Sequence, residues 1–319
     1  MSQAAQSSTP SDATATTGAA APAGEAGGAA LSPEQVVQSA IQEISHIATL
    51  PEVTMKIIKL VEDPDSTAHD LNRVISNDPA LGARILKVVN SAFYGLPGQI
   101  GSINRAIVLL GLNAVKNIAI AASLAKLFRG GKIAPGFHAR DLWTHAIASA
   151  TATRLLAKRA GLGLPDEAFL AGLIHNIGII VELQAQRPQF VQALDLLDQN
   201  QDMTLREAER RILGADHEQF GAGLCQMWKF PASFAYVTGF HHRPQELNQA
   251  NRALTSLVHV ADILTARAEI GFARSAETHE IDTNLLEELK LTAAQVDEVN
   301  EELPEAMQEA QALFADVQP

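Results

Sequence analysis

The apolar residues of this chain recur at helical spacing, and that spacing constrains the fold more than any other feature. In the segment PEVTMKIIKLVEDP, Val53, Ile57 and Leu60 lie three or four positions apart, and later segments repeat the pattern. This spacing places apolar side chains on one face of a helix. Because alternating apolar and polar residues are absent throughout, the sequence predicts an all-α fold.

Glycine and proline divide the helical stretches into sets. The first set begins at Ser32, which suits an N-cap, and Pro33, which suits the first helical position. The loop GGKIAPGF separates this set from a second, longer one. These breaks predict three parts, which are an N-terminal helical lobe at 32–135, a multi-helix lobe at 136–270 and acidic helices at 271–319.

Residues 1–31 are rich in Ala, Ser, Thr and Gly, and they hold almost no large apolar side chains. They cannot bury enough surface to offset the entropy of ordering, so we expect a disordered tail. Without Lys, Arg or an apolar block, this tail is not an export signal.

No apolar run in the chain approaches the roughly 18 residues of a membrane span, so we expect no membrane segment. The single cysteine, Cys225, excludes an internal disulfide and favours a reducing, cytoplasmic compartment.

The negative charge is concentrated at the C-terminal end. The chain carries a formal net charge of −12, and twelve carboxylates against two cations lie from Ile270 onward. No basic stripe appears in the sequence, which gives direct nucleic-acid binding little electrostatic support. The acidic helices favour a basic surface on a protein partner, or self-association through their apolar faces.

A string of histidines with one carboxylate lies in otherwise apolar helices of the second set. Its members, in order, are His145, His175 followed by Asn176, His217, His241, His242 and Asp262. Imidazole and carboxylate groups are the ligands of a nitrogen–oxygen metal site. Spacing alone leaves the interpretation open, because a histidine in a helix is also a common hydrogen-bonded structural residue.

The order of this string resembles that of the HD superfamily. Helices of that superfamily present His, then His-Asp, further His residues and a late Asp around one or two metals. His145 matches the first His, and Asp262 matches the terminal Asp. The segment GLIHNIG matches the His-Asp helix, with Asn176 in place of Asp.

The intermediate histidines resemble those of the HD-GYP phosphodiesterases. His217 and the pair His241-His242 match the histidines at these positions in that branch.

Three departures from the HD-GYP pattern argue against hydrolysis of a cyclic dinucleotide. Asn176 offers one neutral oxygen where a carboxylate could bridge two metals. Ile179 stands where that branch usually carries a lysine, and His217 is followed by EQFGAGL in place of the GYP element.

The first helical set narrows the resemblance to the HDOD domain, the HD-related output domain of bacterial signalling proteins. NSAFYG followed by I-x-S-I-x-x-A-I-x-x-L-G covers residues 90–111, and the resemblance extends from about Ile44 to about Ala266. It implies a cytoplasmic, all-helical regulatory module without catalytic activity. Within this signature, Asn90, Ser91 and Tyr94 have two possible roles. They either close a helix and its following turn or form part of a partner-binding surface.

The vestigial HD site also leaves alternatives open, and no residue in it is assigned a catalytic role. In one interpretation its side chains form a buried hydrogen-bonded network that holds the helices in register. In another, a phosphate or nucleotide binds there, or a residual divalent metal has as ligands His145, His175, His217 and Asp262.

The sequence therefore predicts a non-catalytic adaptor or effector that binds other signalling proteins. The alternatives are a metal-dependent phosphohydrolase acting on cyclic dinucleotides or nucleotides, and a nucleotide sensor without turnover.

Overall fold

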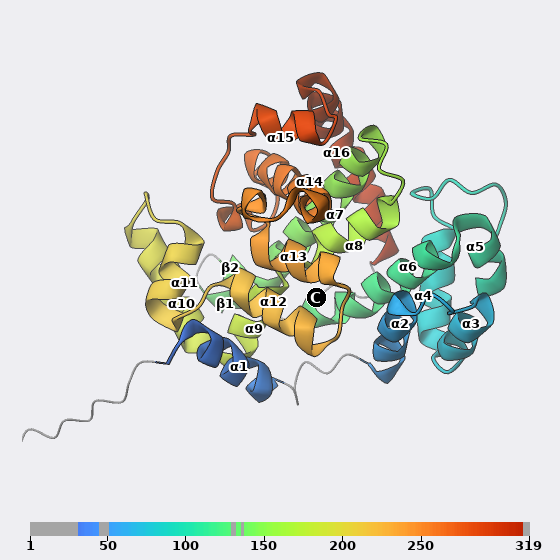
Figure 1. Ribbon diagram of the computed structural model, residues 1–319, viewed down its shortest axis with the longest axis horizontal. Coiled ribbons are helices and arrows are strands. Elements are labelled where there is room, and N and C mark those ends of the chain that lie inside the picture. The colour runs from blue at the N-terminus through green and yellow to red at the C-terminus, as the bar shows by residue number, and fades with distance from the viewer. Residues whose placement is uncertain (1–30, 45–50, 129–131, 135–136, 315–319) are drawn as a thin grey trace, which may run out of the picture. The chain divides into compact units, whose positions relative to one another are not determined.

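The computed structural model describes residues 31–44, 51–128, 132–134 and 137–314 (Figure 1). Except for Leu31, the expected disordered tail lies outside these residues. The all-α prediction is confirmed, with helices from α1 to α16. Among the described residues, sheet is confined to one antiparallel pair that the sequence did not predict, β1 (Lys132–Ala134) and β2 (Phe137–His138).

The first set of helices follows the apolar spacing closely. It comprises α1 (Pro33–Ile44), α2 (Glu52–Glu62), α3 (Ala68–Ser76), α4 (Pro79–Val89), α5 (Ile103–Leu110), α6 (Leu112–Leu124) and the 3-10 turn η1 (Ala125–Phe128). Local chemistry sets the boundaries. Thr67 and Asp70 form a capping box at the start of α3, and the Asp78 side chain accepts from Leu81 N at the start of α4.

The second set surrounds two long helices. It comprises α7 (Ala139–Arg159), α8 (Pro165–Ile174), α9 (Ile177–Ala185), α10 (Arg187–Gln199), α11 (Leu205–Leu213), α12 (His217–Met227), α13 (Ala232–Phe240), η2 (Pro244–Glu246) and α14 (Gln249–Arg267). Helix α7 packs along both α8 and α14, and α12 packs against α9 and α13. Helix α1, which the sequence grouped with the first set, also packs on α9 and α12.

The stretch from Pro165 to Ala185 is apolar and long enough to cross a membrane by composition alone. In this fold, however, 83% of its most apolar window is buried inside the protein. Its hydropathy is accounted for by a place in the core between α7, α6 and α12. Cys225 is also buried.

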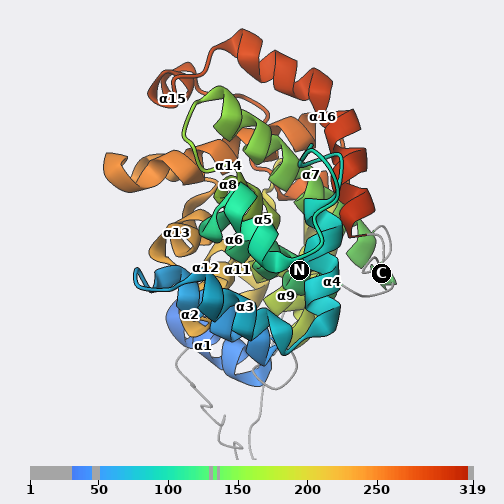
Figure 2. The ribbon, with the colours of Figure 1, turned by 90° about the vertical axis from the view of Figure 1, so that its right-hand side faces the viewer.

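The acidic end folds back onto the second set through η3 (Ala273–Ser275), α15 (Thr283–Glu288) and α16 (Ala293–Leu313). Figure 2 shows α16 running beside α7 and α4. Leu289, Val299 and Leu303 join a buried cluster with Leu257 and Leu264 of α14. The apolar faces of these helices are therefore covered within the chain, while their carboxylates remain outside.

Candidate functional site

The segment GLIHNIG, which resembles the His-Asp helix of the HD superfamily, is not one continuous helix, because α8 ends at Ile174 and α9 begins at Ile177. Asn176 leaves helical geometry with φ −95° and ψ 21°. Gly178, at the start of α9, lies directly on the backbone of α12. A Cβ at this position would collide with His217 O and lie 2.7 Å from Gly221 N. Only a glycine allows this approach, which brings His175 and His217 into one site.

A second glycine places the same segment against α7. A Cβ on Gly172 would lie 2.7 Å from both Ala150 Cα and Ser149 O. Helices α7 and α8 therefore touch through their backbones one turn before His175. The rings of His145 and His175 consequently lie 5.3 Å apart, measured between centroids.

The first group of potential ligands consists of His145, His175 and Asp262, whose ligand atoms all lie within 4.8 Å of one another. His145 Nε2 is 2.9 Å from Asp262 Oδ1, and His175 Nε2 is 3.6 Å from the same oxygen. Burial would raise the pKa of Asp262, but the hydrogen bond from His145 and the nearby imidazole of His175 hold it well below its usual range. The carboxylate is therefore ionised inside the protein.

The imidazole orientations in this group suit a cation. His175 Nδ1 donates to Gly172 O at 2.7 Å, and His145 Nδ1 faces Ile270 O at 3.3 Å. Burial lowers the pKa of His175, which favours its neutral form. Its Nε2 lone pair then points toward the ionised Asp262, and this atom has no hydrogen-bond partner among the described residues. A metal ion between a lone pair and a carboxylate would satisfy both, and backbone carbonyls commonly orient ligating histidines in this way.

The second group consists of His217, His241 and His242, again with all ligand atoms within 4.8 Å. The Nε2 atoms of His217 and His242 lie 3.0 Å apart. His241 Nδ1 donates to Val237 O at 3.2 Å, and in the part of the chain that the structure describes its Nε2 has no hydrogen-bond partner. Burial lowers the pKa of both His241 and His242 well below the usual value. Two neutral imidazoles and a third held by a carboxylate form a donor set that fits a divalent metal.

The two groups adjoin each other. The rings of His175 and His241 lie 5.0 Å apart, and His242 Nδ1 lies 4.0 Å from Asp262 Oδ2. All six potential ligands of the string are thus brought together. The ligand set expected from the sequence is divided between the two groups. His145, His175 and Asp262 form the first group, whereas His217 lies in the second with His241 and His242. Asn176 is 2% exposed, and no described residue forms a hydrogen bond with its Oδ1 or its Nδ2.

Three buried glutamates at the site were missed by the sequence reasoning. Glu209 Oε2 accepts from both the backbone N and Nδ1 of His217, at 2.9 and 2.7 Å. Glu182 is fully buried and has no hydrogen-bond partner within the described ranges, and burial, with Glu209 nearby, raises its pKa well above the usual value. Glu218 accepts from His242 N at 2.9 Å. A carboxylate on the apolar face of each helix is the sequence signal that could have found them.

Arg206 ties these carboxylates to the rest of the fold. It lies 3.0 Å from Glu218 Oε2, 3.1 Å from Asp216 Oδ2 and 3.0 Å from Glu277 Oε2. Asp216 in turn caps the start of α12, the helix that carries His217. The second histidine group is therefore held by a buried network of charges.

The polar side chains of the NSAFYG signature are engaged within the chain. Asn90 Oδ1 accepts from Ile100 N at 2.6 Å, and Ser91 Oγ donates to Val88 O at 2.6 Å. Tyr94 Oη donates to Asp166 at 2.8 Å. The first two bonds close α4 and its following turn, and the third joins that turn to the start of α8.

Comparison with known proteins places the chain near one family. A profile of the HDOD domain matches residues 47–244. A curated relative, an uncharacterized protein of Treponema pallidum (strain Nichols), is 25% identical over 230 residues. The matched region covers 72% of this chain and 44% of that protein, so the chain spans less than half of its relative.

Solved structures share the fold. An HDOD domain protein with unknown function from Geobacter sulfurreducens has a TM-score of 0.74 at 22% identity, covering 88% of this chain and 98% of its own. A candidate signal transduction protein from Marinobacter aquaeolei VT8 has a TM-score of 0.71 at 25% identity, covering 89% and 65%. A candidate phosphohydrolase from Shewanella amazonensis SB2B has a TM-score of 0.66 at 22% identity, covering 86% and 98%. The resemblance expected from the sequence is confirmed.

Proposed function

Because the chain belongs to the HDOD domain family, we propose that it is a signalling module of the bacterial cytoplasm without catalytic activity. It acts by binding other signalling proteins. The observation that carries this proposal is the burial of the histidine centre. His145, His175, His217 and His241 are 0% exposed, and Asn176 and Asp262 are 2% exposed.

Burial matters because a hydrolytic metal must keep a coordination position open for water and substrate. The segment after α14 closes over His145, since a Cβ on Gly271 would collide with Asp141 O and lie 2.5 Å from His145 N. A phosphodiester cannot reach ligands that solvent does not reach. The same burial counts against nucleotide sensing at this centre.

The centre nevertheless suits a divalent metal in a structural role. The first group would hold it through His145, His175 and Asp262, and the three histidines of the second group offer a further site. Such a metal would supply binding energy to the fold and hold α7, α8, α12, α13 and α14 in register. Asn176 contributes no charge to either group, which disfavours a bridged pair of metals.

A metal-dependent phosphohydrolase remains the second candidate. The observation in its favour is the adjacency of two ligand groups, with His242 Nδ1 4.0 Å from Asp262 Oδ2. Two neighbouring metals can stabilise the attacking and leaving oxygens of a phosphodiester. This candidate requires the fold to open around His145 and Asp262.

Metal analysis and a hydrolysis assay on the same preparation decide between the two. The full chain is purified without chelator, its iron, manganese and zinc are quantified, and it is assayed with cyclic dinucleotides and nucleotides. We expect bound metal without turnover. We also expect metal loss in His175→Ala but not in His69→Ala, which changes an exposed histidine on α3. Hydrolysis by the wild type that disappears in His175→Ala would establish the enzyme instead.

A further inference from the structure

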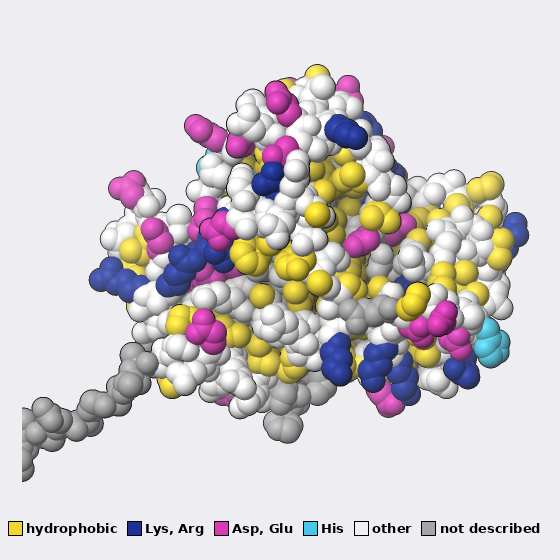
Figure 3. Space-filling view, viewed as in Figure 1, with side chains coloured by type: hydrophobic (Ala, Val, Ile, Leu, Met, Phe, Trp, Pro, Cys, Tyr) yellow, Lys and Arg dark blue, Asp and Glu magenta, His cyan; other side chains and the backbone are white. Residues whose placement is uncertain are grey.

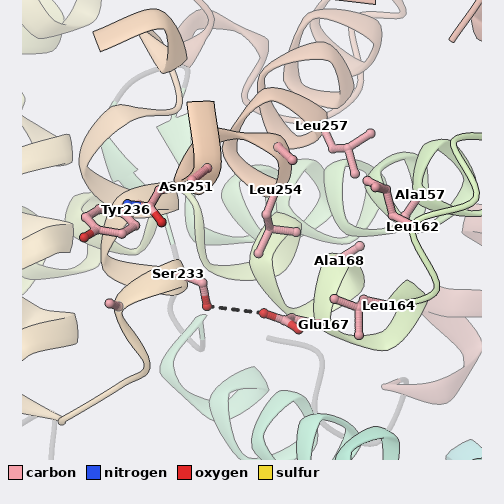
Figure 4. Close-up of a pocket in the computed structure, with 13 residues that line it drawn as sticks. Ala157, Leu162, Leu164, Glu167, Ala168, Ser233, Tyr236, Asn251, Leu254 and Leu257 are labelled. Atoms are coloured by element: carbon pink, nitrogen blue, oxygen red, sulfur yellow. Dashed lines mark hydrogen bonds between the residues drawn. The ribbon is translucent and has the colours of Figure 1, made fainter. Parts of the chain in front are cut away.

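An apolar hollow lies on the surface between the α7–α8 turn and helices α13 and α14 (Figure 4). Its cavity volume is about 370 Å³, and its wall is mostly Ala and Leu, including Leu164, Leu254 and Leu257. One carboxylate, Glu167, stands at its edge and accepts a hydrogen bond from Ser233 Oγ at 3.2 Å. Volumes of this size accommodate several side chains of a partner.

A second hollow continues from the first toward α5 and α6. It has a cavity volume of about 750 Å³ and is lined by residues that include Leu110 and Leu112. Leu164 and Glu167 line both hollows. The two hollows therefore adjoin at the start of α8, and together they are here called the Leu164 groove.

The groove leaves large apolar side chains in water. Leu162 is 41% exposed and Leu164 is 55% exposed, and both lie in the turn that leads into α8. Figure 3 shows hydrophobic side chains gathered on the same face, where α8, α13 and α14 meet. Contiguous exposed apolar surface of this kind typically marks an interaction site.

The charge of the groove indicates what it binds. Among the described residues that line the two hollows, the acids are Asp166 and Glu167, and neither Lys nor Arg is present. Asp166 is engaged by Tyr94 and lies 3.8 Å from Arg154. Within the described part of the chain, Glu167 accepts a hydrogen bond only from Ser233, and so retains acceptor capacity for a cation.

Two occupants from this protein fit poorly. Residues 1–30 contain neither Lys nor Arg and a single large apolar residue, Met1, so they match neither the leucines nor the carboxylate. A second copy would bring another chain of net charge −12 toward an acidic groove.

We propose that the Leu164 groove docks an amphipathic helix of another protein. The apolar residues of that helix, spaced at i, i+3 or i+4 and i+7, contact the leucines, and a Lys or Arg of the helix pairs with Glu167. A helix fits better than a small ligand because the groove is open and extends over two hollows. The inference rests on the proposed function, since it names where the partner binds and what chemistry it has.

The test is selection from a random peptide library displayed on phage, with the full chain as bait. We expect enriched peptides to carry apolar residues at helical spacing together with at least one Lys or Arg. Their affinity, measured with synthetic peptides by fluorescence anisotropy, should fall by about tenfold or more in Leu164→Lys. The matched control is Val108→Lys, which changes a 73% exposed residue on α5 that lines neither hollow.

A charge reversal gives the sharper readout. With Glu167→Lys as bait, the same library should yield peptides with Asp or Glu in place of the basic residue. Three outcomes would each overturn docking of a basic amphipathic helix at the Leu164 groove. They are failure to enrich any peptide, enrichment of acidic peptides by the wild type, and equal binding by Leu164→Lys. None of these outcomes bears on hydrolysis, so the docking site and the non-catalytic function fail separately.

Discussion

Gly178 rests directly on the carbonyl of His217, so that no side chain fits between α9 and α12 at their crossing. The contact joins the segment that carries His175 and Asn176 to His217 of the second histidine group. It explains why a glycine follows His175 by three positions, whatever the site does chemically. Helix packing, and not only ligand chemistry, therefore determines the residues of this motif.

Gly178→Ala should destabilise the protein by about 3 kcal/mol or more, because the added methyl group forces α9 and α12 apart. Urea unfolding followed by circular dichroism measures the change. Gly101→Ala is the matched control, since a Cβ on Gly101 meets nothing within 4 Å. Equal stability of the two variants would show that the helices can separate without cost.

Asn176→Asp should respond to metal more strongly than the wild type. With chelator present, the new carboxylate is buried without a partner, and stability should fall by about 2 kcal/mol or more. Added Mn²⁺ gains a charged oxygen ligand and should raise the melting temperature more than in the wild type. Thermal melts with and without Mn²⁺ measure both effects. Asn300→Asp on the exposed face of α16 serves as control, and an identical Mn²⁺ response in all three proteins would contradict the prediction.

The metal-free protein should lose stability as the pH rises through about 9. Burial lowers the pKa of His217, but the Glu209 carboxylate outweighs it, and the pKa rises from 6.5 to about 9. Because the folded state binds this proton more tightly, the contribution is complete below pH 6.5 and is lost as the pH passes about 9. Urea unfolding at these two pH values, in chelator, measures the difference. Glu209→Gln should reduce it, whereas the exposed Glu280→Gln should not.

Arg206→Met should destabilise the protein by about 1–3 kcal/mol, because Asp216 and Glu218 lose their shared cation and keep Arg210 and Arg243 as partners. Glu218 also holds His242 N, so metal binding by the second group should weaken with it. Chemical unfolding and metal titration test the two effects together. Arg211→Met, an exposed arginine on the same helix, is expected to change neither quantity. A stable variant that still binds metal would show that the charge network is dispensable.

Much of the fold could be predicted from the sequence because helix formation depends on neighbours within one or two turns. The spacing of Val53, Ile57 and Leu60 was sufficient to predict α2. Capping residues such as Asp78 likewise act within their own turn. The short pair of strands was missed, since five residues in two strands carry too little pattern to read.

The prediction that His145, His175, His217 and Asp262 meet came from the resemblance of their order to that of the HD superfamily. How they meet was decided by tertiary structure alone. His145 and Asp262 are 117 positions apart, and no local pattern encodes their 2.9 Å contact.

The division of the histidines into two groups likewise depends on which helices cross, and the crossing at Gly178 depends on backbones from distant segments. The burial of Glu182 and Glu209 follows from the same packing, since a carboxylate in a helix reveals its surroundings only when neighbouring helices cover it. The sequence by itself thus determined the helices, through interactions local to each turn, and its motifs identified the family. The tertiary structure decided the geometry, the burial and the open groove beside α8, because those arise between residues that only folding brings together.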